Sequence, residues 1–349
     1  MSAPDREISA PDREIINSEK GASPRINQSL KKFYFPFVVI LGAIVLSLMI
    51  HGSGFELALD FPVDVSNEME GALDDSVDWI VITFGDFFDA ISDSIKVVLG
   101  KLRDLLIWIP WPIMMSLVFI IGWKVASLKI AIMSVVGMTI LALVNLWEPT
   151  MVTVAIMIVA VFLSIVIGVP VGVLAARSDS VDTGIRPVLD TMQTMPSFVY
   201  LVPGIMLFGL GNVAAIFATV LYALPPCIRL TNLGIRQVDP SVVEAGTSFG
   251  SSNMQLLFKI QIPMAIPTIM AGINQTVMMA LAMSTIAAMV GAGGLGIEVL
   301  RAMGQLREGE AIIAGCAIVI LAIIIDRISQ GYIETVSYTH LTLPTSDLV

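Results

Sequence analysis

The chain has 349 residues, of which 56% are hydrophobic and only 14% are charged, and its formal net charge at pH 7 is −10. Soluble domains carry about 25% charged residues, so this composition excludes a soluble globular protein and is typical of a membrane protein with several spans. Because there is no basic patch, we expect no nucleic-acid partner. The two histidines, His51 and His340, are isolated and show no metal-ligand spacing, so we expect no metal or other cofactor.

The N-terminal stretch is polar and is followed by a short apolar run. We expect residues 1–33 to form a disordered cytoplasmic tail and residues 34–50 to form the first transmembrane helix. The heptapeptide Ser2–Ile8 is repeated without change at Ser9–Ile15, which we interpret as a recent duplication or a cloning artefact. A cleaved signal peptide is the less favoured reading of the apolar run, because its polar leader is long and many spans follow.

Residues 51–108 form an acidic segment with an amphipathic helix. Between Asp78 and Trp108 the apolar residues recur at helical spacing, and most charged residues fall on the other side. A helix of this kind with low net hydrophobicity is expected to lie in the membrane interface. The alternative is that it packs on a partner subunit.

Further apolar runs give eight expected spans when residues 34–50 are included. The charge of the short loops predicts that both termini and the polar stretch near residue 250 lie in the cytoplasm. We expect two transmembrane helices within residues 109–146. We interpret residues 329–349 as a tail, and we interpret the last part of this tail as an unrelated extension. The later spans are predicted at 109–122, 128–146, 150–175, 188–209, 212–230, 264–290 and 311–327.

A polar, helix-forming stretch, Asp239–Pro263, separates two of these apolar runs. Asp239 is suited to cap a helix and Pro240 to occupy its first position. Gly250 is placed to end that helix in a left-handed conformation. One of the residues Ser251, Ser252 and Asn253 then caps a second short helix. The sequence therefore predicts two short helices joined at a glycine, which form a rigid elbow on the membrane surface.

The spacing of this stretch resembles the cytoplasmic coupling motif of type I ABC importer permeases, with pattern E-A-A-x3-G-x9-I-x-L-P. The chain differs where the pattern has its second alanine and its leucine. The text from Gln193 to Tyr200 and from Pro225 to Val238 resembles the glycine betaine/proline betaine permeases more closely still. The matching residues, which the resemblance implies contact an ATPase, are Glu244, Ala245, Gly246, Gly250, Ile260, Ile262 and Pro263.

The resemblance implies an all-α polytopic fold with residues 147–328 as the permease core. It also implies a homodimer, two copies of a separate ABC ATPase subunit, and a periplasmic or lipid-anchored substrate-binding protein. The expected function is import of glycine betaine, proline betaine or a similar osmoprotectant across the bacterial cytoplasmic membrane by alternating access. Three aromatic residues, Phe198, Tyr200 and Phe208, are candidates to line the pathway, although ordinary packing is the simpler explanation for them.

Other functions stay open at this stage. The coupling motif does not separate betaine import from import of choline, methionine or a sulfonate. A secondary carrier is less favoured, because the sequence shows neither paired inverted repeats nor charged residues in most spans. A membrane-embedded enzyme is disfavoured because no catalytic cluster is evident.

The chain has no P-loop, so ATP hydrolysis is assigned to another subunit. Gly291–Gly296 fits G-x-G-x-x-G but follows an apolar run rather than a strand, which indicates flexible backbone at the outer mouth rather than a nucleotide site.

Overall fold

The computed structural model describes residues 25–52 and 65–341, and every regular element in these two ranges is a helix. The all-α fold expected from the sequence is therefore confirmed for this part of the chain. The chain divides into two units, Met1–Ser76 and Val77–Val349. The duplicated heptapeptide and residues 342–349 lie outside the described residues.

The first unit contains helix α2, Arg25–Gly52, whose apolar stretch is Pro36–His51. The helix covers the run predicted as the first span and begins inside the stretch predicted as a tail. Its large apolar side chains between Phe37 and Met49 are exposed, as those of a lipid-facing helix are. The apolar stretch is nevertheless shorter than the ~20 residues that a span ordinarily needs.

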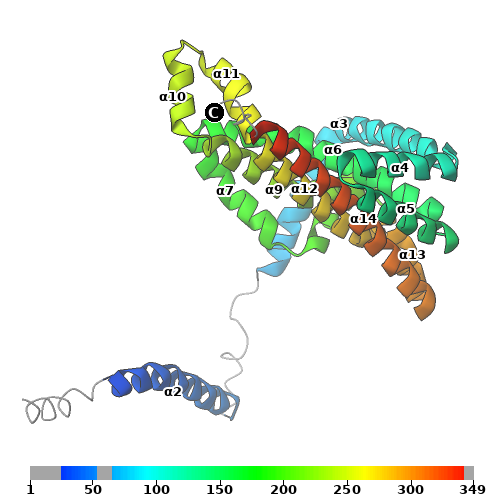
Figure 1. Ribbon diagram of the computed structural model, residues 1–349. Helices are drawn as coiled ribbons and strands as arrows, with labels where there is room; N and C mark the ends of the chain where they lie inside the picture. The colour runs from blue at the N-terminus through cyan, green and yellow to red at the C-terminus, as the bar shows by residue number, and fades with distance from the viewer. Residues whose placement is uncertain (1–24, 53–64, 342–349) are drawn as a thin grey trace, which may run out of the picture. The chain divides into compact units, whose positions relative to one another are not determined.

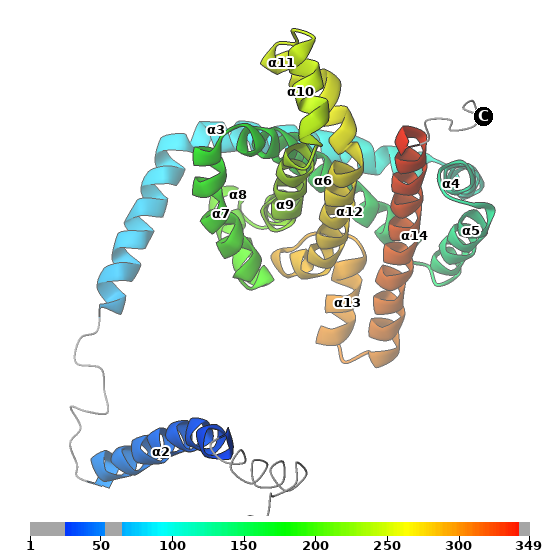
Figure 2. The same cartoon turned by 60° about the vertical axis from the view of Figure 1, so that its left-hand side comes forward.

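The second unit is a bundle of helices with a small projection at one end (Figures 1 and 2). In chain order its elements are α3 (Ser66–Trp108, from Val77 onward), α4 (Trp111–Val125), α5 (Leu128–Leu143), α6 (Trp147–Arg177), α7 (Asp179–Thr194), η2 (Ser197–Tyr200), α8 (Leu201–Phe208), α9 (Asn212–Arg236), α10 (Pro240–Ser248), α11 (Asn253–Leu256), the π-helical turn η3 (Leu257–Gln261), α12 (Ile262–Ile286), η4 (Ala287–Val290), α13 (Leu295–Gly304) and α14 (Glu308–Leu341).

Four helical runs in the described residues are long and apolar enough to cross a membrane: α6, α9, Asn253–Val290 and Glu308–Gly331. Helices α3 and α4 form a pair bent by 102°, which makes a fifth if it is counted as one span. The multi-pass helical architecture is therefore confirmed, with fewer full-length spans than the eight predicted. Helix α5 lies where the span 128–146 was expected but is a shorter apolar helix, and α4, which lies where 109–122 was expected, is one arm of the bent pair.

The predicted span 188–209 is broken and needs correction. Helix α7 starts earlier than predicted and ends at Thr194, after which η2 and α8 continue the path. The break occurs because Met195 precedes Pro196, and a residue before proline is pushed out of the helical region. Met195 accordingly has an extended backbone, with φ −65° and ψ 136°.

The centre of the second unit is formed by α9 packed between α6 and α12 (Figure 2). Glycines let these backbones approach closely. A Cβ atom on Gly172 of α6 would lie 2.6 Å from the Cβ of Thr231 and 2.8 Å from the carbonyl oxygen of Ile228. A Cβ atom on Gly272 of α12 would lie 2.9 Å from the Cβ of Leu230. Small residues at such contacts are a main source of helix association in lipid, where there is no hydrophobic driving force between helices.

Helix α3 packs its apolar side against this same unit. Leu99 is buried in a cluster with Ile156 of α6 and Ile216 of α9. Phe88 meets Phe208 edge-on at a ring-centroid distance of 5.8 Å. The amphipathic helix predicted from the sequence is confirmed, and part of its apolar face is covered by the chain's own helices rather than by lipid or a partner alone.

The glycine contacts yield a first prediction. Replacing Gly172 by alanine should lower the midpoint of thermal unfolding in detergent by several degrees, since overpacking costs ~1–3 kcal/mol and the contacting atoms include backbone. Gly315→Ala on α14 is the matched control, because an added Cβ meets nothing within 4 Å there. Equal midpoints for the two variants would contradict the packing described.

Candidate functional site

The elbow, which is Asp239–Pro263, projects from one end of the second unit, with α10 and α11 reaching beyond the ends of α9 and α12 (Figures 1 and 2). The Asp239 carboxylate accepts a hydrogen bond of 2.8 Å from the backbone N–H of Ser241, and Pro240 occupies the first turn. This hydrogen bond lowers the pKa of Asp239 below its usual range. The predicted start of the first helix is therefore confirmed in residue detail.

The corner of the elbow is a left-handed glycine. Gly250 has φ +79°, and its N–H is bonded to the carbonyl oxygen of Thr247. Ser252 then caps α11 in a reciprocal capping box with Gln255. Both the glycine turn and the serine cap agree with the sequence prediction. An L-residue at position 250 would cost roughly 1–2 kcal/mol in this conformation.

The two arms of the elbow touch at Gly246. Its missing side chain leaves room for Ile260, whose Cδ1 atom would lie 2.6 Å from an added Cβ. Below this contact, Leu257 is buried against Ile235 of α9 and Ala265 of α12. The structure thus brings Gly246 and Ile260 together, and it joins the elbow to two of the central helices.

The outer surface of the elbow is apolar at three points. Phe249 is 89% exposed, and Met254 and Phe258 are also exposed. Glu244 and Ala245, on α10, are exposed as well, whereas Ile262 and Pro263 are half-buried where α12 begins. Sequence reasoning did not single out Phe249 as a surface residue. An aromatic residue directly before a helix-ending glycine in a polar stretch is the signal that would have found it.

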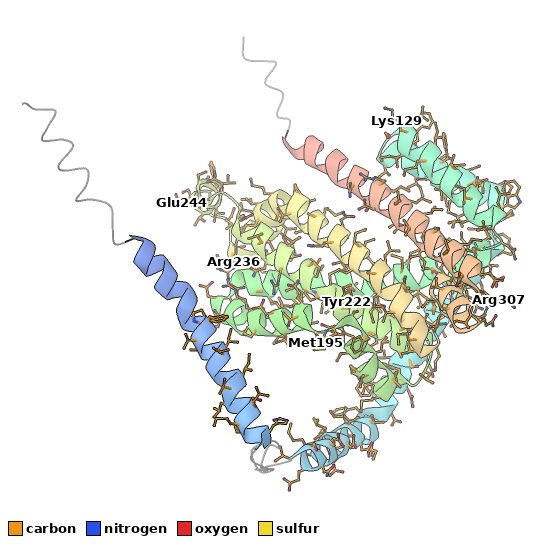
Figure 3. The ribbon with its side chains drawn as sticks, turned by 90° about the horizontal axis from the view of Figure 1, so that it is seen from below. Lys129, Met195, Tyr222, Arg236, Glu244 and Arg307 are labelled. Carbon is orange, nitrogen blue, oxygen red and sulfur yellow. The ribbon has the colours of Figure 1, made fainter. Side chains whose placement is uncertain are left out.

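A cavity of about 550 Å³ lies at the root of the elbow. Arg177, Arg236 and Glu244 supply its charged groups, and Val243 and Leu256 supply apolar walls. In Figure 3 Arg236 and Glu244 lie at the same end of the second unit. The elbow is therefore not a detached loop, because its inner side borders charged residues of α6 and α9.

A row of polar contacts joins α7 to α9; we call it the α7–α9 seam. At the elbow end, Asp182 is almost fully buried and accepts hydrogen bonds from Arg186 at 2.5 Å and Asn232 at 2.7 Å. Arg236 adds an ion pair to Asp179 at 2.7 Å. The bond from Arg186 holds the pKa of the Asp182 carboxyl below its usual range, with Asn232 and Arg236 acting in the same direction and burial opposing them.

The seam continues to a second ion pair, between Asp190 and Arg229. The predicted span 212–230 ends one residue after Arg229, but α9 runs on to Arg236, so Arg229 lies well inside the helix. Neither residue was identified as functional from the sequence. Finding this pair requires knowing that α7 and α9 are neighbours, because the two residues are 39 positions apart.

The three predicted pathway aromatics have different surroundings. Phe198 is 59% exposed, in η2. Tyr200 is buried, donates its hydroxyl hydrogen to the carbonyl oxygen of Met192, and meets the ring of Tyr222 edge-on. Phe208 is packed between Phe88 and Phe217. Of the three, only Phe198 presents most of its side chain at the surface of the single chain.

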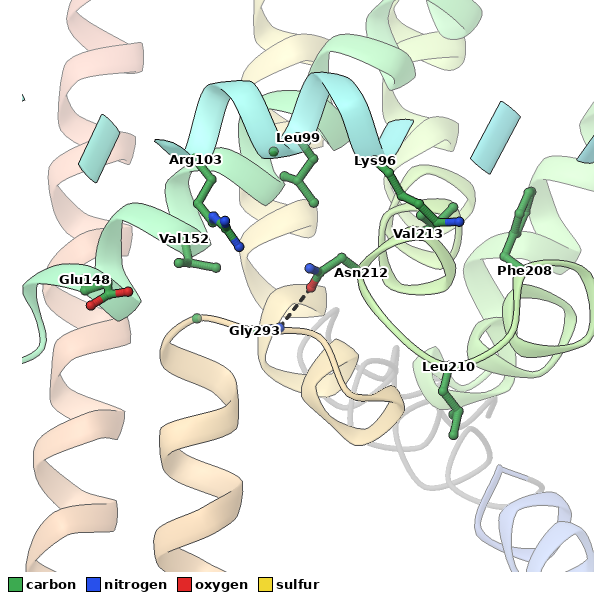
Figure 4. Close-up of a pocket in the computed structure, with 12 residues that line it drawn as sticks. Lys96, Leu99, Arg103, Glu148, Val152, Phe208, Leu210, Asn212, Val213 and Gly293 are labelled. Carbon is green, nitrogen blue, oxygen red and sulfur yellow. Dashed lines mark hydrogen bonds between the residues drawn. The ribbon is translucent and has the colours of Figure 1, made fainter. Parts of the chain in front are cut away.

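The opposite end of the bundle carries a cavity of about 460 Å³ (Figure 4). It is lined by Lys96 and Arg103 of α3 and by Asn212 at the start of α9, whose side-chain oxygen accepts a hydrogen bond from Gly293. A Cβ atom on Gly294 would lie 2.4 Å from Thr153 Oγ1. The glycine-rich stretch follows the helical turn η4 rather than a strand. Its contacts with Asn212 of α9 and Thr153 of α6 hold its backbone in place, so it is not the flexible segment expected from the sequence.

Comparison with known proteins identifies the family. The family model described as the binding-protein-dependent transport system inner membrane component matches residues 168–335. The glycine betaine/proline betaine transport system permease protein ProW of Escherichia coli (strain K12) is 45% identical over 257 residues, which cover 74% of this chain and 73% of that protein. This chain belongs to the binding-protein-dependent transport permeases. It is a transport subunit and a multi-pass protein of the inner membrane.

Further family members are similar over comparable lengths. The glycine betaine transport system permease protein OpuAB of Bacillus subtilis (strain 168) is 45% identical over 260 residues, covering 74% of this chain and 92% of that protein. The glycine betaine/carnitine transport permease protein GbuB of Listeria monocytogenes serotype 1/2a (strain 10403S) is 43% identical over 257 residues, covering 71% and 90%. Among solved structures, an inward-facing MetNI methionine ABC transporter is 24% identical with a TM-score of 0.49, covering 53% of this chain and 92% of that one.

The buried end of the α7–α9 seam predicts a pH-dependent stability. Asp182→Asn should lower the unfolding midpoint at pH 7 by an amount equivalent to ~1–3 kcal/mol, because hydrogen bonds to a charged group are lost. Since the folded-state pKa is lowered from 3.8, this contribution is present above pH 3.8 and is lost as the pH falls below it.

The difference in midpoint between wild type and Asp182→Asn should therefore be constant from about pH 8 to 5 and shrink below about pH 4. Asp104→Asn, which removes an exposed ion pair with Arg103, is the control and should change little at any pH. A gap that widens on acidification would contradict the assignment.

Proposed function

We propose that this chain is the permease subunit of an ATP-driven importer for glycine betaine, proline betaine and related osmoprotectants. Two copies form the path across the membrane, and each engages one ATPase subunit on the cytoplasmic side. A separate binding protein delivers the substrate at the outer side. Hydrolysis of ATP belongs to the ATPase, and this chain changes between inward-facing and outward-facing states.

The geometry of the elbow supports this proposal. Its residues at the coupling-motif positions form a compact projection with an outward apolar surface around Phe249. A short amphipathic helix of this kind suits docking into a groove of a partner. Glu244, Ala245, Gly246, Gly250, Ile260, Ile262 and Pro263 are the residues we assign to ATPase coupling.

A force applied to the elbow is transmitted directly to the membrane-spanning helices α12 and α9. The elbow leads without interruption through η3 into α12, and Leu257 fixes it to α9. When ATP binding draws two ATPase subunits together, the elbows of the two copies follow, and α12 and α9 move with them. Packed elements of this kind shift as rigid bodies rather than deform continuously.

The proposed class of substrate is inferred from the substrates for which the similar proteins are named. The similar proteins with 43–45% identity are named for glycine betaine, proline betaine or carnitine transport. These solutes share a fully substituted, positively charged nitrogen and a carboxylate. Import of another small solute is the alternative within the same mechanism, and nothing in the described residues favours it.

Coupling is tested at the corner of the elbow. In proteoliposomes containing the complete transporter, Gly250→Leu should abolish most ATP-dependent uptake, because leucine at φ +79° distorts the elbow. The ATPase should still hydrolyse ATP, so the ratio of substrate moved to ATP consumed should fall at least tenfold.

Gly309→Leu is the matched control, since Gly309 lies on α14 at the other end of the bundle with open space around it and an ordinary backbone. It should retain wild-type coupling. Wild-type uptake by Gly250→Leu would exclude the elbow as the coupling element. Uptake by the wild type in the absence of nucleotide would instead indicate a secondary carrier.

A further inference from the structure

The length of α9 places the ion pair between Asp190 and Arg229 at membrane depth. Helix α9 has 25 residues and is a candidate span. At 1.5 Å per residue it is about 37 Å long, which exceeds the ~30 Å hydrocarbon layer by only a few ångströms at each end. Arg229 is seven residues before the end of the helix at Arg236, so it lies about 10 Å from that end and inside the hydrocarbon layer.

The pair is also open to the surface of the single chain. The side chain of Arg229 is 40% exposed and that of Asp190 is 68% exposed. The neighbouring polar residues Thr191, Gln193 and Thr194 of α7 are exposed as well. Charged and polar side chains at this depth face a water-filled cavity or a protein partner rather than lipid, because the cost of exposing them to hydrocarbon is high.

An aromatic ring lies on the same face. Tyr222 is two helical turns before Arg229, so the two residues lie in one row on α9, about 10 Å apart along the helix axis. Side chains on a helix lean toward its N-terminus, which is the side of Arg229 on which Tyr222 lies. The Tyr222 ring is half-buried and is held by Tyr200 at a ring-centroid distance of 5.8 Å. Figure 3 shows Tyr222 further along the bundle than Arg236, toward Met195.

We propose that Asp190, Arg229 and Tyr222 form half of a binding site for the transported zwitterion, facing the water-filled path between two copies. This inference rests on the proposed function and adds the residues that recognise the cargo within the membrane. The substrate carboxylate pairs with the Arg229 guanidinium, which is suited to bidentate recognition. The substituted ammonium, which has no N–H to donate, lies near the Asp190 carboxylate and the face of Tyr222.

This arrangement selects a zwitterion over a simple cation. A betaine that inserts between Asp190 and Arg229 replaces each partner with a group of the same charge, so neither charge is left unpaired. A cation without a carboxylate, such as choline, would compete for Asp190 and leave Arg229 uncompensated at membrane depth, which is costly. Tyr200, predicted as a pathway residue, acts here as the support that positions Tyr222.

The test uses the complete transporter in proteoliposomes, with initial rates of labelled glycine betaine uptake and basal ATP hydrolysis measured together. Arg229→Gln and Asp190→Asn should each lower uptake at least tenfold while basal hydrolysis is retained. Tyr222→Leu should lower uptake, and Tyr222→Phe, which keeps the ring face, should not. Arg301→Gln, which removes an exposed ion pair with Glu298 at the other end of the bundle, is the control and should transport normally.

A charge reversal separates recognition from structure. The double variant Asp190→Arg with Arg229→Asp rebuilds the ion pair in the opposite direction. It should unfold at the wild-type temperature but remain defective in uptake, since the site now presents its charges the wrong way round. Recovery of wild-type uptake in this variant, or normal uptake by Arg229→Gln, would overturn the inference and assign the pair to structure alone. If wild-type transporter does not accumulate glycine betaine, the proposed function fails first, and the two failures are thereby distinguished.

Discussion

Contact between helix backbones at glycines is the interaction on which the rest of this structure depends. Helix α9 lies against α6 at Gly172 and against α12 at Gly272, and there is no room for a side chain at either glycine. In lipid, such close packing replaces the hydrophobic driving force that holds soluble bundles together. Because the three helices form one packed body and α12 continues directly into the elbow, displacement of the elbow is passed to the whole core. The Gly246 contact with Ile260 keeps the elbow itself from bending.

Charged side chains attach α7, the first part of the broken crossing, to this core, whereas η2 and α8 are attached by apolar packing. Helix α7 is too polar to qualify as a span, and it is held to α9 by Asp182 near the elbow and by Asp190 deeper in the membrane. Beyond the break at Met195, the buried ring of Tyr200 packs against Tyr222 of α9. The second unit thus combines an apolar core that transmits motion with a polar seam that offers charges to the path. This division explains how one chain can be both a lipid-embedded scaffold and a surface for a charged cargo.

The parts of the fold that obey local rules were predictable from the sequence, residue by residue. Asp239 as a cap and Gly250 as a left-handed corner follow from propensities that act within a few positions. The break before Pro196 has a local cause too, but a long apolar run hid it. The pairing of Arg229 with Asp190 depends on how two helices dock, and no pattern in one sequence reports that. For the same reason the apolar face of α3 did not reveal whether lipid or protein covers it.

If a nucleotide-driven partner moves this chain through its elbow, the two elbows should approach each other when ATP binds, and their separation can be measured. A spin label on Ser248→Cys, at the exposed end of α10, reports the separation of the two elbows in the complete transporter. Cys316 is exposed and is replaced by serine in this background, while the buried Cys227 is kept. The label-to-label distance should be clearly shorter with bound ATP than without nucleotide. An unchanged distance, in a transporter that still takes up substrate, would contradict it.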